Sequence, residues 1–141
     1  MILLDTNVVS EGLRPRPDPK VSQWLDAQRP ADLFLSMPVI AELHYGAELL
    51  PAGIRRVHLE LAIRRIEEAF ADRTLPFDRA AAHEYGRIMA YRDRLGHATG
   101  TMDGLIAAIA KVHGATVATR DSRGFDDLGL EIVNPFDPSA T

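Results

Sequence analysis

The chain contains no cysteine among its 141 residues. This absence excludes a disulfide framework, a thiolate zinc site, an iron–sulfur cluster and a cysteine nucleophile. Long apolar runs are also missing, because the longest uninterrupted stretch, Leu105–Ala110, is far shorter than the ~20 residues that cross a bilayer. The first residues show no basic segment followed by a long apolar one, so we expect no signal peptide, no membrane partner and a cytoplasmic protein.

An excess of positive charge is absent as well. The chain has 16 Lys and Arg against 20 Asp and Glu, a formal net charge of −4. This balance argues against a basic, non-specific nucleic-acid coat, although it leaves open a local metal-assisted site for phosphodiesters. The five histidines show no metal-ligand spacing such as His-Glu-x-x-His, so zinc is not expected. The length suits one domain over residues 1–141 with its own core.

What is present is a regular alternation of short apolar runs and amphipathic segments. Strands are expected at 2–4, 33–35, 74–77, 115–119 and 131–133. Helices are expected after Pro19 and over 37–50, 55–71, 78–95 and 101–113, with a loose tail over 135–141. Strands that alternate with helices from end to end predict a parallel α/β sandwich. Ligands of such folds lie beyond the carboxyl ends of the strands.

Four acidic residues stand at that predicted edge. They are Asp5 after the first strand, Glu42 and Asp103 in the early turns of two helices, and Asp121 after the fourth strand. Carboxylates gathered at one edge repel one another, which raises their pKa values. Mg²⁺ or Mn²⁺ relieves this repulsion and prefers oxygen ligands. Such ions polarise a phosphodiester and activate a water molecule, so the pattern points to phosphoryl chemistry.

Each acid also has an ordinary structural explanation. Asp5 can cap the following helix, and Asp121 can serve as a turn residue. Glu42 and Asp103 can complement helix dipoles at helix N-termini. What favours a site over these separate roles is that all four acids share one predicted edge.

Four segments of the chain carry a resemblance to a known family. They are Ile2–Asn7 with Ser10-Glu11, Leu35-Ser36 with Val39–Leu43 and Gly46, Asp103–Ala108, and Ala118–Asp121 followed by Phe125 and Val133–Phe136. These segments resemble the motifs of PIN-domain nucleases, and most closely the FitB-like subgroup of VapC-type toxins. They occur in the family's order and spacing over essentially the whole chain. Each motif is weakly specific alone, and together they identify the chain as similar to this family.

The resemblance implies a PIN-like three-layer α/β/α sandwich with a central, mostly parallel sheet. It implies a Mg²⁺- or Mn²⁺-dependent endoribonuclease that acts as the toxin of a toxin–antitoxin pair. The implied metal ligands and catalytic residues are Asp5, Glu42, Asp103 and Asp121, with Asn7 and Thr119 in support. The implied partners are an RNA substrate, a cognate antitoxin, a second copy in a homodimer, and operator DNA reached through the antitoxin.

Two positions depart from the family pattern. Many relatives have Asn where this chain has Asp121, so direct metal ligation by Asp121 is an open question. Many also have Asp before the aromatic residue, where this chain has Gly124 and carries Asp126 and Asp127 just afterwards. Whether either of these later acids substitutes for the missing one is open too.

Basic side chains near these acids supply candidate RNA contacts. Arg120 and Arg123 flank the last acid and are our candidates for binding substrate phosphates. Arg92, Arg94 and His97 precede the third acid, and they are either RNA-backbone contacts or ordinary solvated groups.

Two other functions compete with ribonuclease activity. The chain could be a regulatory binding module that acts within an antitoxin–operator DNA complex with little catalysis. It could also be a phosphatase of the haloacid dehalogenase type, which likewise begins with a strand and an Asp. That motif requires a second Asp two residues later, where this chain has Asn7, so the phosphatase is disfavoured.

Overall fold

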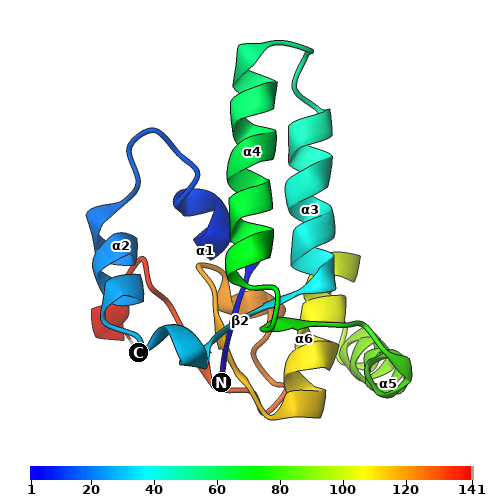
Figure 1. The fold of residues 1–141 in the computed structure, drawn as a ribbon. Helices are drawn as coiled ribbons and strands as arrows, with labels where there is room; N and C mark the ends of the chain where they lie inside the picture. Colours follow the sequence, from blue (N-terminus) through cyan, green and yellow to red (C-terminus); the bar gives the residue numbers. More distant parts are fainter. Residues whose placement is uncertain (141) are drawn as a thin grey trace.

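The computed structural model describes residues 1–140 and contains a five-stranded sheet covered by helices (Figure 1). The strands are β1 (Ile2–Leu4), β2 (Leu33–Ser36), β3 (Thr74–Leu75), β4 (Thr116–Ala118) and β5 (Ile132–Val133). Their order across the sheet is β3-β2-β1-β4-β5, and all four pairings are parallel. The expected three-layer sandwich with a parallel sheet is therefore confirmed, and β1 lies at its centre.

Six α-helices surround this sheet in the described residues. They are α1 (Thr6–Glu11), α2 (Pro19–Asp26), α3 (Met37–Glu48), α4 (Ile54–Ala69), α5 (Arg79–Arg94) and α6 (Thr101–His113). Helices α3 and α4 form a long hairpin that projects from the sheet, and α5 and α6 pack against each other near the base of α3 (Figure 1). The sequence predicted only cap and turn chemistry where α1 forms. The structure has a short helix there, which begins at Thr6 because the Asp5 carboxylate accepts a hydrogen bond from Thr6 N and caps it.

Side chains of the strands alternate between two apolar clusters, as the pleat of a strand requires. Leu3 and Val117 point into the cluster formed with α5 and α6. Leu4 and Ala118 point into the opposite cluster, against which Trp24 of α2 packs while remaining partly exposed. The first residues after β1 and β4, Asp5 and Thr119, are therefore expected to point to the same face as Leu3 and Val117, the face covered by α6. This alternation directs polar residues after these strands toward α6.

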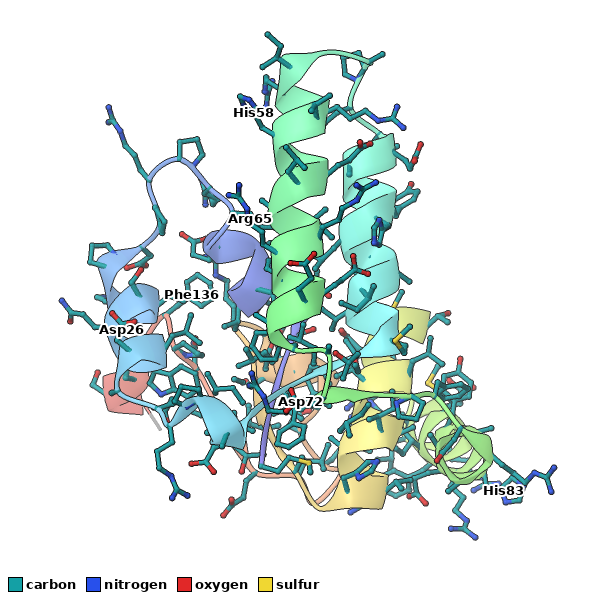
Figure 2. The ribbon with its side chains drawn as sticks, in the orientation of Figure 1. Asp26, His58, Arg65, Asp72, His83 and Phe136 are labelled. Atoms are coloured by element: carbon teal, nitrogen blue, oxygen red, sulfur yellow. The ribbon has the colours of Figure 1, made fainter. Side chains whose placement is uncertain are left out.

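The segment after β5 is held more firmly than the expected loose tail. Pro135 is fully buried, and the Arg120 guanidinium lies 3.7 Å from the centre of the Phe136 ring. Phe136 lies on the α2 side of the molecule (Figure 2), where it packs on the second apolar cluster. Proline and an aromatic ring gain more from burial than a polar tail does, so order extends past Pro135. Thr141, the last residue of the expected tail, lies outside the described residues.

No helix among residues 1–140 is both long and apolar enough to cross a membrane.

Candidate active site

Asp5 is the centre of a polar cluster at the carboxyl edge of the sheet. It follows β1 directly, and its residue is only 5% exposed. One carboxylate oxygen accepts a hydrogen bond from Thr6 N at 2.8 Å. The other accepts from Thr119 Oγ1 at 2.7 Å and from Asn7 Nδ2 at 3.2 Å. Burial raises the pKa of Asp5, and these hydrogen bonds counteract part of that effect because they stabilise the charged form.

Thr119, which follows β4, connects this part of the chain to the residues after β1. Its hydroxyl is fully buried, donates to Asp5, and accepts from Asn7 Nδ2 at 3.3 Å and from Asp121 N at 3.1 Å. Asn7 also accepts a hydrogen bond from Arg120 N at 3.1 Å through Oδ1. The structure thus brings Asn7 and Thr119 together around Asp5, the arrangement that a supporting role requires.

Glu42 reaches the same edge from α3. Thr6 Oγ1 donates a 2.8 Å hydrogen bond to Glu42 Oε1, so the first residue of α1 orients this carboxylate. Sequence reasoning assigned no such role to Thr6. Because Leu3 pairs with Phe34, the same register places Ser36 beside Asp5. The Ser36 hydroxyl is fully buried and has no hydrogen-bond partner among the described residues.

Asp103 carries the clearest sign that the four acids converge. Its pKa is raised to about 6, first by burial and then by the charges of Asp5, Asp121 and Glu42. The Arg92 charge acts in the opposite direction. All four acids predicted from the sequence are therefore close enough to influence one another electrostatically. Such mutual repulsion is relieved by a proton or by a bound cation.

The donor set fits a hard divalent cation. The converging groups are carboxylates, hydroxyls and the Asn7 amide, and their oxygen atoms are the ligands that Mg²⁺ and Mn²⁺ prefer. His58 and His83 lie far apart on α4 and α5 (Figure 2). Among residues 1–140, no three acidic or histidine side chains are close enough together to coordinate a metal ion in their present positions. The carboxylates are thus neighbours that a cation would draw together.

Asp121 is the most exposed of the four acids. Its carboxylate accepts from Arg123 N at 3.1 Å and lies 3.4 Å from the Arg123 side chain, which is almost fully exposed. The Arg120 guanidinium instead stacks on Phe136 and approaches Glu11 at 4.0 Å. Of the two arginines, Arg123 is therefore the freer to meet a ligand.

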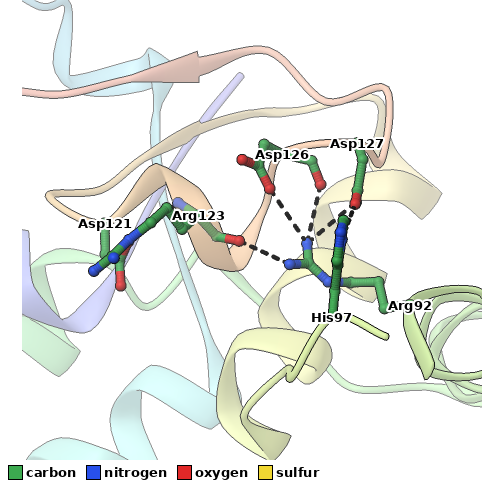
Figure 3. Close-up of polar contacts among 6 residues, drawn as sticks. All are labelled: Arg92, His97, Asp121, Arg123, Asp126 and Asp127. Atoms are coloured by element: carbon green, nitrogen blue, oxygen red, sulfur yellow. Dashed lines mark hydrogen bonds and ion pairs between the residues drawn. The ribbon is translucent and has the colours of Figure 1, made fainter. Parts of the chain in front are cut away.

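Arg92 is neither a solvated charge nor an RNA contact, so both interpretations made from the sequence are wrong. It is 2% exposed, and its guanidinium donates to Arg123 O at 2.8 Å and Asp126 O at 3.0 Å (Figure 3). It also pairs with the Asp127 carboxylate at 3.3 Å. Its spacing could have indicated this, because Arg92 follows Ile88 by four residues on the buried face of α5.

Asp126 and Asp127 face Arg92, which bears on whether they replace the acid missing at position 124. Asp127 has a left-handed backbone (φ 62°) and is held by Arg92 and by His97, whose Nδ1 lies 2.6 Å from Asp127 Oδ2. The Asp126 carboxylate lies 3.8 Å from the same guanidinium (Figure 3). Both acids therefore serve to anchor the 122–127 turn.

The pKa of Asp103 predicts a pH dependence of stability. Folding raises this pKa from 3.8 to about 6, so the folded protein binds a proton more tightly than the unfolded chain. The free energy of unfolding should therefore fall as pH rises from about 4 to 6 in metal-free buffer. An Asp103→Asn variant lacks this penalty, so its Tm advantage over the original protein should grow across that window. A Tm difference that is constant between pH 4 and 7 would contradict the prediction.

This chain is similar in sequence and fold to known proteins. The PIN domain family profile matches residues 2–130. VapC ribonuclease Y4jK of Sinorhizobium fredii is 44% identical, covering 99% of this chain and 100% of that protein. Toxin FitB of Neisseria gonorrhoeae is 43% identical, covering 96% and 99% of the two chains. In the solved structure of FitAB bound to an IR36 DNA fragment, a 42% identical chain superposes with a TM-score of 0.91 and 96% coverage of both chains. The chain therefore belongs to the PIN-domain family, among the VapC and FitB toxins.

Proposed function

We propose that this protein is a Mg²⁺- or Mn²⁺-dependent endoribonuclease that hydrolyses RNA phosphodiester bonds as the toxin of a toxin–antitoxin pair. The observation that carries the proposal is the convergence of four carboxylates, expressed in the pKa of Asp103, which is raised to about 6. A buried cluster of this kind costs stability unless a cation or proton neutralises it, so it is typical of a functional site. The relative named VapC ribonuclease supports RNA as the substrate class.

In this proposal the chain's own groups position the ligands. Asp5, Glu42 and Asp103 would hold the divalent ion, and Asp121 would complete the set from the more exposed side. Thr119 and Asn7 fix the Asp5 carboxylate, while Thr6 orients Glu42. When bound, the ion polarises the phosphodiester, lowers the pKa of the attacking water and neutralises the leaving oxygen.

The arginines beside Asp121 bind the RNA backbone in the same proposal. Arg123 is exposed, and among residues 1–140 its side chain pairs with Asp121 alone, so it can reach a phosphate on the approaching strand. Arg120 is also partly exposed, but its stacking on Phe136 limits it to a phosphate that passes beside that ring.

The proposed partners are a cognate antitoxin, a second copy in a homodimer, and operator DNA bound through the antitoxin, all in the cytoplasm. The FitAB pair bound to DNA supports the antitoxin and the DNA. The α3–α4 hairpin carries several exposed apolar side chains. Exposed apolar patches are typical of contacts between proteins, so these side chains support an interface there. They include Tyr45, Leu49, Ile54, Val57 and Leu61.

Metal removal tests the proposed activity. The purified protein should cleave total RNA with added Mg²⁺ or Mn²⁺, and cleavage should cease with EDTA and return when the metal is restored in excess. Mapping the 5′ ends of the products identifies the RNA and the sequence cut. Cleavage that persists in EDTA would contradict the metal-dependent mechanism.

The alternative is a regulatory module that acts in an antitoxin–operator DNA complex with little catalysis. The DNA-bound FitAB structure is the observation in its favour. Expression of the Asp103→Asn variant separates the two functions, because a catalytic toxin loses growth inhibition while a binding module keeps it. The variant retains the shape of the side chain, so its complex with an antitoxin should still form.

A further inference from the structure

Gly124 meets the Asp103 carboxylate at the site. It ends the short turn Ser122–Gly124, and a Cβ added to it would overlap Oδ2 of Asp103 and lie 3.0 Å from Cγ. Gly124 is not among the glycines with a left-handed backbone, so its conformation alone does not demand glycine. The space that a side chain would occupy is already filled by the carboxylate.

The turn that carries Gly124 is fixed by contacts to α5 and to the apolar core. Arg92 binds Arg123 O at 2.8 Å, and Phe125 is 1% exposed in the apolar core. The backbone N–H groups of Phe125 and Asp126 both donate to Ser122 O at 2.9 Å. A small outward shift of this turn would break several of these contacts at once. A Cβ at position 124 would therefore be accommodated by rotation of the Asp103 side chain, whose carboxylate is the group it meets.

Asp103 is held from the other side as well. The next residue, Gly104, lies so close to α5 that an added Cβ would meet the Met89 sulfur and come within 3.0 Å of a Tyr85 ring carbon. The first turn of α6 is thus pressed between α5 and the 122–124 turn. Asp103 has little freedom to retreat from position 124 by moving the helix.

We propose that Gly124 is a positioning residue for the Asp103 carboxylate. Because it has no side chain, Gly124 leaves this volume to the carboxylate, which would there be in reach of a cation shared with Asp5 and Glu42. The cation part of this inference rests on the proposed function. The steric part rests on the packing alone, and the two parts are tested separately.

A stability comparison in EDTA tests the packing without any metal. Gly124→Ala should lower the Tm in the original protein and equally in an Asp103→Asn background, where the side-chain shape persists. In an Asp103→Ala background the cost should disappear, because the added methyl group then has room. The matched control is Gly86→Ala in α5, where an added Cβ meets no atom within 4 Å and the Tm should stay equal or rise. An equal loss in all three backgrounds, or no loss in any, would overturn the proposal.

Mn²⁺ titration by calorimetry tests the effect on the site. Gly124→Ala should weaken Mn²⁺ binding on the order of tenfold, the effect typical of displacing a ligand's support, whereas Gly86→Ala should leave it unchanged. Equal affinity of the original protein and Gly124→Ala would overturn the positioning role. An original protein that binds no Mn²⁺ would instead contradict the proposed function, and the stability comparison would still decide the contact. If Gly124→Ala fails to fold, folding of the double variant with Asp103→Ala supports the contact, and its failure overturns it.

Discussion

An Asp5→Asn variant should lose RNA cleavage by on the order of a hundredfold or more at saturating Mg²⁺. Asp5 stands at the centre of the cluster, and an amide in its place provides one fewer anionic oxygen for the cation. The measurement is the initial rate of cleavage of total RNA or of a mapped fragment, with Asp93→Asn, an exposed acid of α5, as the control. Undiminished cleavage by Asp5→Asn would remove the basis of the metal-site proposal.

Loss of folding should not explain this result. Burial raises the pKa of Asp5, which means that its charge opposes folding when no cation is bound. An amide oxygen can replace only one of the two accepting oxygens, so the relieved charge is offset by a lost hydrogen-bond acceptor. The Tm of Asp5→Asn in EDTA at pH 7 should therefore stay close to that of the original protein. Adding Mg²⁺ should raise the Tm of the original protein and not that of the variant, because only a ligand that binds the folded state stabilises it.

The second large effect should be on stability. Arg92→Met should lower the free energy of unfolding by about 3–5 kcal/mol, the usual cost of removing one partner of a buried ion pair. The variant leaves Arg123 O, Asp126 O and the Asp127 carboxylate without their shared donor. For a chain of this size the loss corresponds to a Tm decrease of roughly 10 °C or more.

The control for this prediction is Arg94→Met. Arg94 lies two residues later on the same helix but is exposed, so its removal should change the free energy of unfolding by less than about 0.5 kcal/mol. Thermal denaturation of both variants in EDTA makes the comparison independent of metal. Equal Tm values for Arg92→Met and Arg94→Met would show that the buried guanidinium contributes no more than a surface charge.

The fold could be predicted because short buried strands and amphipathic helices alternate visibly along the chain. Parallel strands then placed Asp5 and the residues after β4 at one edge without any structure. The pairing of Thr6 with Glu42 could not be predicted, because it depends on how α1 and α3 approach each other. The close packing of Gly124 against Asp103 could not be predicted for a similar reason. It depends on how the 122–124 turn approaches α6, and the sequence does not show that distance.

Arg92 shows a different limit. A residue's type suggests exposure, and an arginine in a helix that also carries Arg87 and Arg94 suggests a solvated surface. Arg92 is nevertheless buried, because its helical spacing from Ile88 places it on the buried face of α5. Its partners are mainly backbone oxygens of a turn about 30 residues later, and no pattern in the sequence reports backbone oxygens as partners.

The hydrogen bond between Asp5 and Thr119 spans 114 positions in the chain. Central strand β1 likewise pairs with β4, so its second neighbour arrives only after most of the protein has been synthesised. Contacts between such distant residues form slowly, because a long loop must close before they are made. Synthesis therefore delays assembly of the carboxylate cluster, and a growing chain on the ribosome stays without its complete site until residues beyond Thr119 have emerged.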